Sequence, residues 1–309
     1  MTTLLLHHPA CLEHRTPSGH PERPDRIRAV ERVLAAETFA SLDRRLAEKA
    51  DFDTIALAHP RAYVDAIEEA SPESGLVQID GDTVMSPGTL EAVLRGVGAA
   101  IQGVDAVMTG EATNAFSAMR PPGHHAERTR AMGFCLFNNA AVAARYAQRK
   151  HGAERVAIVD WDVHHGNGSQ DIFWSDQSVL YASTHQMPLY PGTGAVSERG
   201  DHDTIVNAPL RPGADGEAFR EAFESRIIPR LEAFRPDLLI ISAGFDAHWR
   251  DPLANLRLEA QDFAWATKRL MAFAAKHCSG RVVSLLEGGY DLQGLGDSVA
   301  AHVATLMEA

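Results

Sequence analysis

Short apolar runs alternate with longer segments of helical periodicity from residue 113 to near the carboxyl end of the chain. The apolar runs predict strands near 113–117, 155–161, 178–183, 204–207, 237–242 and 281–286. Helical spacing predicts helices over 138–150, 216–233, 259–277 and 292–307. Strands that alternate with helices indicate parallel βαβ units. We therefore expect an α/β fold of three αβα layers, with a mostly parallel sheet covered on both faces.

The amino-terminal part has a less regular pattern. It predicts a strand over 3–6, a surface loop over 14–26, a helix that carries Ile27, Val30, Val33 and Leu34, a short helix over 59–70 and a loop over 71–86. Ser86 and Pro87 have the residue types of an N-cap and a first helical position, which predicts a long helix from about 88 to 108. No repeat or linker-like segment interrupts the chain, so we expect one domain over residues 1–309.

Composition narrows the class of protein. The 309 residues are 45% hydrophobic and 23% charged, which is typical of a globular protein with a sizeable core. A net charge of −12 argues against a general nucleic-acid binder. The amino terminus lacks the basic region of a signal peptide, and no apolar run approaches the length of a membrane span. Three widely spaced cysteines without a C-x-x-C pair indicate a reducing compartment, and we expect the cytoplasm.

Residues 155–168, R-V-A-I-V-D-W-D-V-H-H-G-N-G, place ionisable side chains directly after an apolar run. If the strand continued through them, Asp160, Asp162 and His164 would lie on one face, and the glycines that follow would end it. An ordinary strand with a polar end is the alternative, but unpaired buried charge is costly. We therefore interpret this stretch as a metal site.

Polar clusters also follow other predicted strands: M-R-P-P-G-H-H-A, A-G-F-D-A-H and E-G-G-Y-D. The carboxyl ends of parallel strands meet at one edge of a sheet, so we expect these clusters to form one site. Asp246 would then join Asp162 and His164. Two carboxylates and one imidazole fit zinc or another divalent first-row ion, and three ligands leave a position open for catalysis. Taken alone, Asp246 has a helix N-cap as its alternative role.

The tandem imidazoles of His124 and His125 are candidates for general acid–base chemistry near neutral pH. Asp160 and Asn167 are available as orienting partners for the two rings. Tyr290 follows two glycines and has a phenol that could donate a hydrogen bond to a developing oxyanion. The alternatives are structural histidines and a partly buried tyrosine beside a turn.

Six motifs occur in the order found in the histone deacetylase superfamily: R-P-P-G-H-H-A, G-F-C-L-F-N-N, V-D-W-D-V-H-H-G-N-G-S-Q, P-G-T-G, S-A-G-F-D-A-H and L-E-G-G-Y. The loop G-H-P-E-R-P-D-R and Asn167 resemble the class II branch, which includes bacterial deacetylase-like amidohydrolases and acetylpolyamine amidohydrolases. The resemblance spans roughly residues 14–300. It implies the arginase–deacetylase fold, a single catalytic domain and a zinc-dependent amidohydrolase.

By motif match, the resemblance implies zinc binding by Asp162, His164 and Asp246. It implies catalytic roles for His124 with Asp160, for His125 with Asn167, and for Tyr290. His124 would act mainly electrostatically, His125 as general base and then acid on a metal-activated water, and Tyr290 on the scissile carbonyl. Acetate, or a related acid, and a free amine would be the products.

The resemblance also implies an apolar tunnel for the acyl-lysine chain, with Gly133, Phe134 and Tyr190 along it. Leu253 stands where the polyamine-selective vertebrate relative has a glutamate that reads a distant ammonium. Leucine favours an acetylated lysine peptide or protein, and an acetylated polyamine stays open as the alternative substrate. The family's structural potassium ions would bind at Asp160 and Ser183, and at a second site near Phe173, Asp176 and Val179.

Two other functions are possible for a chain of this fold. A manganese ureohydrolase of the arginase type would need a second metal, and the tandem histidines and Tyr290 argue against it. A catalytically weak acyl-lysine-binding regulatory module would be indicated by loss of Tyr290 or of a ligand, and all are present. His20, Glu22 and Asp82 are expected at the rim of the site or as solvated loop residues.

Overall fold

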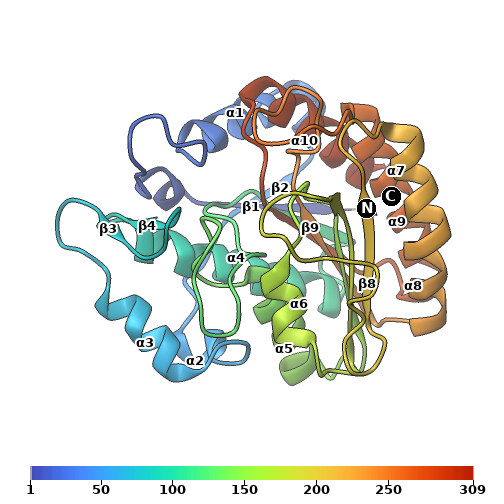
Figure 1. Cartoon of the computed structure of the whole chain (residues 1–309), viewed down its shortest axis with the longest axis horizontal. Helices are drawn as coiled ribbons and strands as arrows, with labels where there is room; N and C mark the ends of the chain where they lie inside the picture. Colours follow the sequence, from blue (N-terminus) through green and yellow to red (C-terminus); the bar gives the residue numbers. More distant parts are fainter. Residues whose placement is uncertain (1, 309) are drawn as a thin grey trace.

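The computed structural model describes residues 2–308 and has a twisted eight-stranded sheet between two layers of helices (Figure 1). The strands are β1 (Thr3–His7), β2 (Asp43–Leu46), β5 (Asn114–Ser117), β6 (Val156–Asp160), β7 (Val179–Gln186), β8 (Ile205–Leu210), β9 (Leu238–Ala243) and β10 (Val282–Leu286). They are ordered β2-β1-β5-β10-β9-β6-β7-β8, and every neighbouring pair is parallel. The predicted α/β class with a parallel sheet is confirmed.

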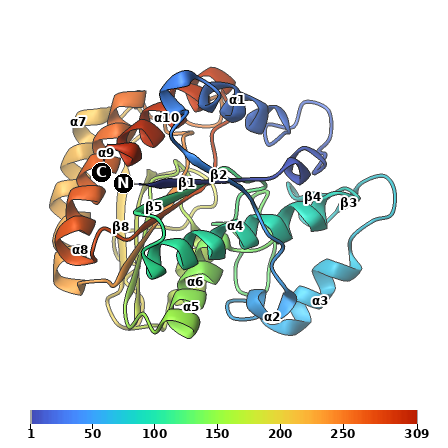
Figure 2. The same cartoon turned by 180° about the vertical axis from the view of Figure 1, so that it is seen from behind.

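The helices are α1 (Asp25–Leu34), α2 (Phe52–Ile55), α3 (Arg61–Glu69), α4 (Thr89–Thr109), α5 (Asn139–His151), α6 (Asn167–Phe173), α7 (Gly216–Ala222), α8 (Ile228–Phe234), α9 (Ala260–His277) and α10 (Leu292–Met307). Helices α4, α5 and α6 cover one face of the sheet, and α1, α10, α9, α7 and α8 cover the other (Figures 1 and 2). None of the helices within residues 2–308 is long and apolar enough to cross a membrane.

The centre of the sheet is buried on both faces, which explains its continuous apolar strands. Every residue of β6, β9 and β10 is buried, and Ile158 pairs with Ile240 across β6 and β9. The same register sets Asp160 beside Ser242 on β9 and beside Ser183 on β7. The carboxyl ends of these strands therefore lie at one level, from which the loops of the site begin.

The structure corrects the expectation that the strand continues beyond Asp160. Strand β6 ends at Asp160, because the Asp160 carboxylate accepts the N–H of Asp162 at 3.0 Å and the Asp162 carboxylate accepts the N–H of His164 at 2.9 Å. These bonds fold the chain into successive turns. Gly166 precedes α6 rather than terminating a strand.

Other elements differ from the prediction because their sequences lack a clear hydrophobic pattern. Strand β2 has the sequence D-R-R-L at the sheet edge, so it lacks the apolar pattern of a buried strand. The predicted loop over 71–86 contains a small hairpin of β3 (Val77–Gln78) and β4 (Val84–Met85). Helices α2 and α6 were also not predicted; they have four and seven residues, too few for a clear periodicity.

Two predicted helices differ in detail. Helix α4 begins at Thr89 after Gly88, so Ser86 is not its N-cap; the Ser86 hydroxyl bonds instead to the Glu13 carbonyl at 3.1 Å. The helix predicted over 216–233 is divided by a π-helical turn between α7 and α8. Pro229 follows this turn, and its missing N–H prevents a regular hydrogen bond to the preceding turn.

Candidate metal centre and catalytic site

Asp162, His164 and Asp246 come together at the carboxyl ends of β6 and β9. Their potential ligand atoms all lie within 4.8 Å of one another, and all three residues are buried. His164 Nδ1 lies 3.0 Å from an Asp246 oxygen and 3.2 Å from an Asp162 oxygen. No other group of three or more His, Cys, Asp or Glu residues within 2–308 meets this geometry. Asp246 does not cap a helix, so that alternative is wrong.

Backbone N–H groups orient the carboxylates of Asp162 and Asp246. The N–H of Val163 donates to Asp246 Oδ1 at 2.8 Å, and the N–H of Gly288 donates to Asp162 Oδ2 at 2.8 Å. A Cβ on Gly288 would stand 2.3 Å from an Asp246 oxygen, so only glycine allows this close approach. Oriented, buried carboxylates beside one imidazole nitrogen match the donor set of a divalent metal ion, and these residues therefore fit the predicted metal.

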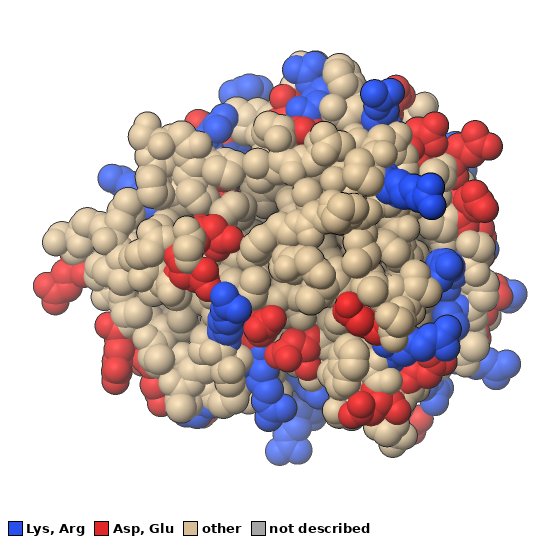
Figure 3. Space-filling model, in the orientation of Figure 1, with Lys and Arg blue, Asp and Glu red and all other residues tan. Residues whose placement is uncertain are grey.

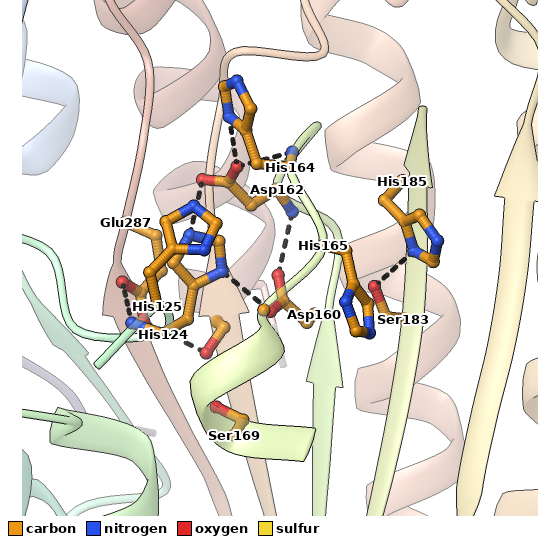
Figure 4. A network of polar contacts seen from close by, with 12 residues as sticks. His124, His125, Asp160, Asp162, His164, His165, Ser169, Ser183, His185 and Glu287 are labelled. Carbon is orange, nitrogen blue, oxygen red and sulfur yellow. Dashed lines mark hydrogen bonds and ion pairs between the residues drawn. The ribbon is translucent and has the colours of Figure 1, made fainter. Parts of the chain in front are cut away.

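His124 lies between two carboxylates (Figure 4). Its Nδ1 is 3.0 Å from Asp160 Oδ2, and its Nε2 is 3.8 Å from Asp162 Oδ2. Burial alone lowers the pKa of this imidazole, but Asp162 and Asp160 outweigh burial and raise the pKa of His124 well above its ordinary value. His124 is therefore a fixed positive charge beside the ligands.

His125 has the opposite environment. Its Nδ1 is 2.8 Å from Asn167 Oδ1, and the Asn167 amide nitrogen donates to Glu127 at 2.8 Å. Because Glu127 accepts from the amide nitrogen, the amide oxygen faces His125, whose Nδ1 therefore carries the proton. Burial, with the neighbouring rings of His124 and His164, lowers the pKa of His125 well below its ordinary value. The Nε2 atom of His125 is left with a free lone pair.

Two adjacent imidazoles, with ring centres 4.0 Å apart, thus have pKa values displaced in opposite directions. Environments that separate the pKa values of neighbouring titratable groups are a common feature of acid–base sites.

Tyr290 lies on the loop between β10 and α10. Its N–H donates to the Asp251 carboxylate at 2.7 Å, and the Arg26 guanidinium lies 4.9 Å from the centre of its ring. Burial raises the pKa of Tyr290 well above its ordinary value, against the opposing charge of Arg26. The phenol therefore keeps its proton and can act as a donor.

Phe134 and Tyr190 each contact one of these groups. The Phe134 ring contacts Tyr290 edge-on at 5.9 Å between centres, and Tyr190 contacts His125 edge-on at 5.2 Å. Gly133 has a φ of 57°, and a Cβ there would lie 2.5 Å from the His125 ring. The two aromatic rings thus form walls beside the candidate catalytic groups.

The remaining predicted residues lie on the loop after Asp246 and around strand β7. Leu253 is half-buried on the loop after Asp246. Ser183 is adjacent to Asp160 in the sheet, but its hydroxyl bonds to His185 at 2.9 Å. The proposed second cation site comprises Phe173, Asp176 and Val179 around the start of β7. Arg145 pairs with the Asp176 side chain at 2.5 Å, so this carboxylate already has a cationic partner.

Glu22 is not a rim residue. It is fully buried, and its carboxylate pairs with Arg120 at 2.5 Å and with Arg26 at 3.2 Å. Arg26 also donates to the carbonyls of Gly289 and Glu287, which places this charge network behind the Tyr290 loop. Its only sequence signal is the charge-rich loop before α1.

Two further carboxylates near the site, Asp251 and Glu287, were not predicted from the sequence. Asp251 accepts the N–H groups of Tyr290 and Asp291, and Glu287 accepts the N–H groups of Gly123 and His124. Both carboxylates are buried and belong to recognised motifs, D-P-L and L-E-G-G-Y. Their position next to predicted catalytic residues was the signal that could have identified them.

Comparison with known proteins finds relatives over most of this chain. A family model described as histone deacetylase domain matches residues 20–306. The chain is 41% identical over 300 residues to a "Probable deacetylase" of Archaeoglobus fulgidus, covering 95% of this chain and 83% of the relative. It is 39% identical over 278 residues to a "Histone deacetylase-like amidohydrolase" of Pseudomonas aeruginosa, covering 88% and 73%.

The crystal structure of the HDA15 HD domain has the same fold. It superposes with a TM-score of 0.92 at 36% sequence identity, and the match covers 98% of this chain and 88% of that one. Because the family match and the aligned relatives each span most of this chain, it belongs to the histone deacetylase family, whose relatives here are named as deacetylases and an amidohydrolase.

Proposed function

We propose that this chain is a zinc-dependent deacylase that removes acetyl or related acyl groups from lysine side chains of peptides or proteins. The observation that carries the proposal is the three-residue ligand cluster flanked by a neutral imidazole, a cationic imidazole and a protonated phenol. Each of these groups has a distinct part in amide hydrolysis.

Asp162, His164 and Asp246 would hold the zinc ion. When bound, zinc lowers the pKa of water and polarises a carbonyl oxygen, which are the two requirements of amide hydrolysis near neutral pH. The cluster has three buried protein ligands. Three ligands leave one coordination position open for water or substrate, which supports a catalytic rather than a structural metal site.

His125 has the free Nε2 lone pair that a general base requires. It would take a proton from the attacking water and return that proton to the amine nitrogen as the C–N bond breaks. His124, held by Asp160, would keep its charge and favour negative charge developing nearby. The phenol of Tyr290 would donate a hydrogen bond to the carbonyl oxygen as that oxygen becomes an oxyanion.

The walls of the site indicate the substrate. Phe134 and Tyr190 offer apolar contact to a methylene chain, with Gly133 leaving room beside His125. Leu253 provides no charge that would select the distal ammonium of a polyamine. Figure 3 shows uncharged residues over most of the centre of this face, with acidic side chains to the left of it, and this uncharged centre supports a substrate that presents a neutral segment to the protein.

One observation favours an acetylated polyamine as the alternative substrate. Tyr190 is close to the carboxylates of Asp82 and Asp80, which together with burial raise the pKa of its phenol. A cationic amine would be attracted to such carboxylates. Asp80 is already paired with Arg130 at 2.9 Å, however, which leaves Asp82 as the main acidic group there.

We also propose a structural potassium ion and a cytoplasmic location for this chain. A structural potassium ion near Asp160 and Ser183 is supported by their adjacent positions on β6 and β7. A reducing, cytoplasmic environment is supported by Cys11, Cys135 and Cys278, which are free and buried.

The test is a comparison of kcat/KM for the zinc-loaded protein on an acetyl-lysine peptide and on an acetylated polyamine, with a His125→Ala control. Faster turnover of the peptide, lost in the control, is the expected result. Faster turnover of the polyamine would assign the chain to the alternative substrate. No turnover of either, with zinc bound, would show that the acyl group or the whole substrate class is wrong, and would favour the binding-module function.

A further inference from the structure

Glu287 is the first residue after strand β10, and its side chain is fully buried. The carboxylate accepts three hydrogen bonds: from the N–H of Gly123 at 2.7 Å, from the N–H of His124 at 3.2 Å, and from the Ser242 hydroxyl at 3.1 Å. These donors belong to two segments, the loop after β5 and the end of β9, and both are far from residue 287 in the sequence. One carboxylate therefore joins the loop after β5, the end of β9 and the end of β10.

The two amide donors belong to the backbone that carries the tandem histidines. Figure 4 shows Glu287 on one side of His124 and Asp160 on the other. Asp160 fixes the direction of the His124 ring, whereas Glu287 fixes the main chain from which the ring projects. His125 is the next residue, so the same contact sets the starting point of its side chain.

Position 287 is also tied to the Tyr290 loop. Its own N–H donates to the Ala243 carbonyl, and its carbonyl accepts from Arg26, which also holds the Gly289 carbonyl. The backbone at 287 is therefore fixed independently of its side chain. The Glu287 carboxylate connects this fixed backbone to the loop that carries His124 and His125.

Other contacts also restrain this loop: the Ser169 N–H donates to the His124 carbonyl at 3.2 Å, and the chain at Gly123 is closely packed. A Cβ on Gly123 would lie 2.7 Å from the Asn139 nitrogen and 2.8 Å from the Phe137 carbonyl oxygen, so the chain at Gly123 passes in direct contact with another segment. Without Glu287, two buried N–H groups would lose their acceptor, and a shift of the loop to recover hydrogen bonds would displace both imidazoles.

We propose that Glu287 is a positioning residue that holds the His124–His125 backbone at a fixed distance from the Tyr290 loop during the reaction proposed above. The Glu287 side chain is long enough for its carboxylate oxygens to accept the N–H groups of Gly123 and His124, and it does not need to contact the substrate. A displacement of about 1 Å between catalytic groups can reduce turnover on the order of 100-fold. The effect would fall on kcat, because the substrate walls Phe134 and Tyr190 do not depend on this carboxylate.

Two variants of Glu287 separate the effect of side-chain length from the effect of the negative charge. Glu287→Gln keeps the length of the side chain and one acceptor oxygen, while the Ser242 hydroxyl can rotate to accept from the new amide. Burial raises the pKa of Glu287 to about 7, so the neutral glutamine is a close mimic of one of its protonation states. Glu287→Asp keeps the carboxylate but shortens the side chain by about 1.5 Å, which withdraws it from the Gly123 N–H.

The experiment measures kcat, KM and bound zinc for both variants of the full chain, with Glu69→Gln on the exposed face of α3 as the control. Glu287→Asp should lower kcat about 100-fold, with KM within about threefold and zinc content unchanged, whereas Glu287→Gln should stay within about tenfold of the wild type. Equal kcat values for wild type and Glu287→Asp, or a larger loss in Glu287→Gln than in Glu287→Asp, would overturn the proposal.

Hydrogen exchange gives a second readout that needs no activity. The amides within 118–127 should exchange at least tenfold faster in Glu287→Asp than in the wild type, while Glu287→Gln retains most of the protection. Unchanged exchange in Glu287→Asp would also overturn the positioning role. An inactive wild type would refute the proposed function separately, and the exchange rates would still decide the role of Glu287.

Discussion

Substitution of Gly288 by alanine tests the metal centre without any assumption about the substrate. A Cβ at this position would lie 2.3 Å from Asp246 Oδ2 and 2.6 Å from Asp162 Oδ2. Ordinary carbon–oxygen contacts begin near 3.3 Å, so one of the three groups would have to move by about 1 Å. Metal sites tolerate changes of only about 0.2 Å in ligand distance.

Neither carboxylate is free to rotate away. Asp162 Oδ1 accepts the N–H of His164 at 2.9 Å, and Asp246 Oδ1 accepts the N–H of Val163 at 2.8 Å. Both side chains are also buried, so displacement breaks hydrogen bonds that water cannot replace. We expect the Kd for zinc to rise at least 10- to 100-fold and the protein to lose about 1–3 kcal/mol of stability from overpacking.

The assay is a competitive zinc titration against a chromophoric chelator, together with thermal unfolding of the metal-free protein. Gly81→Ala is the matched control, because a Cβ at Gly81 on the exposed turn between β3 and β4 would meet nothing within 4 Å. If Gly288→Ala bound zinc as tightly as Gly81→Ala, Asp162 and Asp246 would not be the ligands.

Three further predictions address the catalytic groups and the core. Tyr290→Phe keeps the ring and removes the donor, so kcat should fall about 100- to 1,000-fold while the melting temperature is unchanged; a kcat close to that of the wild type would contradict the role of the phenol. Asn167→Ala frees the His125 ring and should lower kcat about 10- to 100-fold with little change in KM, and a change confined to KM would contradict this role. Burial lowers the pKa of His302 from its ordinary value of 6.5 to about 3. Between these two pKa values only the unfolded chain takes up the proton, so the stability of the folded protein falls as the pH falls. Urea unfolding of the metal-free protein measures the free energy of unfolding between pH 6 and pH 4. This free energy should fall with decreasing pH more steeply in the wild type than in His302→Gln, by about 1.4 kcal/mol per pH unit. Equal slopes in the two proteins would refute this assignment.

The buried part of the fold was predictable because burial leaves a strong pattern. Strands β6, β9 and β10 are continuous apolar runs, since both faces of a parallel sheet are covered. Strand β2 is a polar edge strand, and its pairing with β1 depends on the rest of the sheet. Helix α6 includes Gly168, where a Cβ would lie 2.2 Å from the Ala126 carbonyl oxygen, so this glycine reflects tertiary packing.

The convergence of the candidate site was predictable for a related reason. Asp162, His164 and Asp246 follow buried strands, and parallel strands bring their carboxyl ends to one edge. Glu287 also follows a buried strand, and Asp251 lies close to Asp246 in the sequence, but no local pattern shows that these carboxylates accept backbone N–H groups, so their roles were not assigned. Glu22 was expected at the rim or as a solvated loop residue, since its pairing with Arg120 joins residues 98 positions apart.

The most direct test of the central claim is a zinc titration of metal-free protein, followed by the rate of acetate release from an acetyl-lysine peptide. A single ligand cluster of Asp162, His164 and Asp246 predicts that activity is absent without metal and rises linearly to a plateau at one zinc per chain. Full activity in the metal-free protein, or a plateau at two metals per chain, would contradict a mononuclear zinc deacylase.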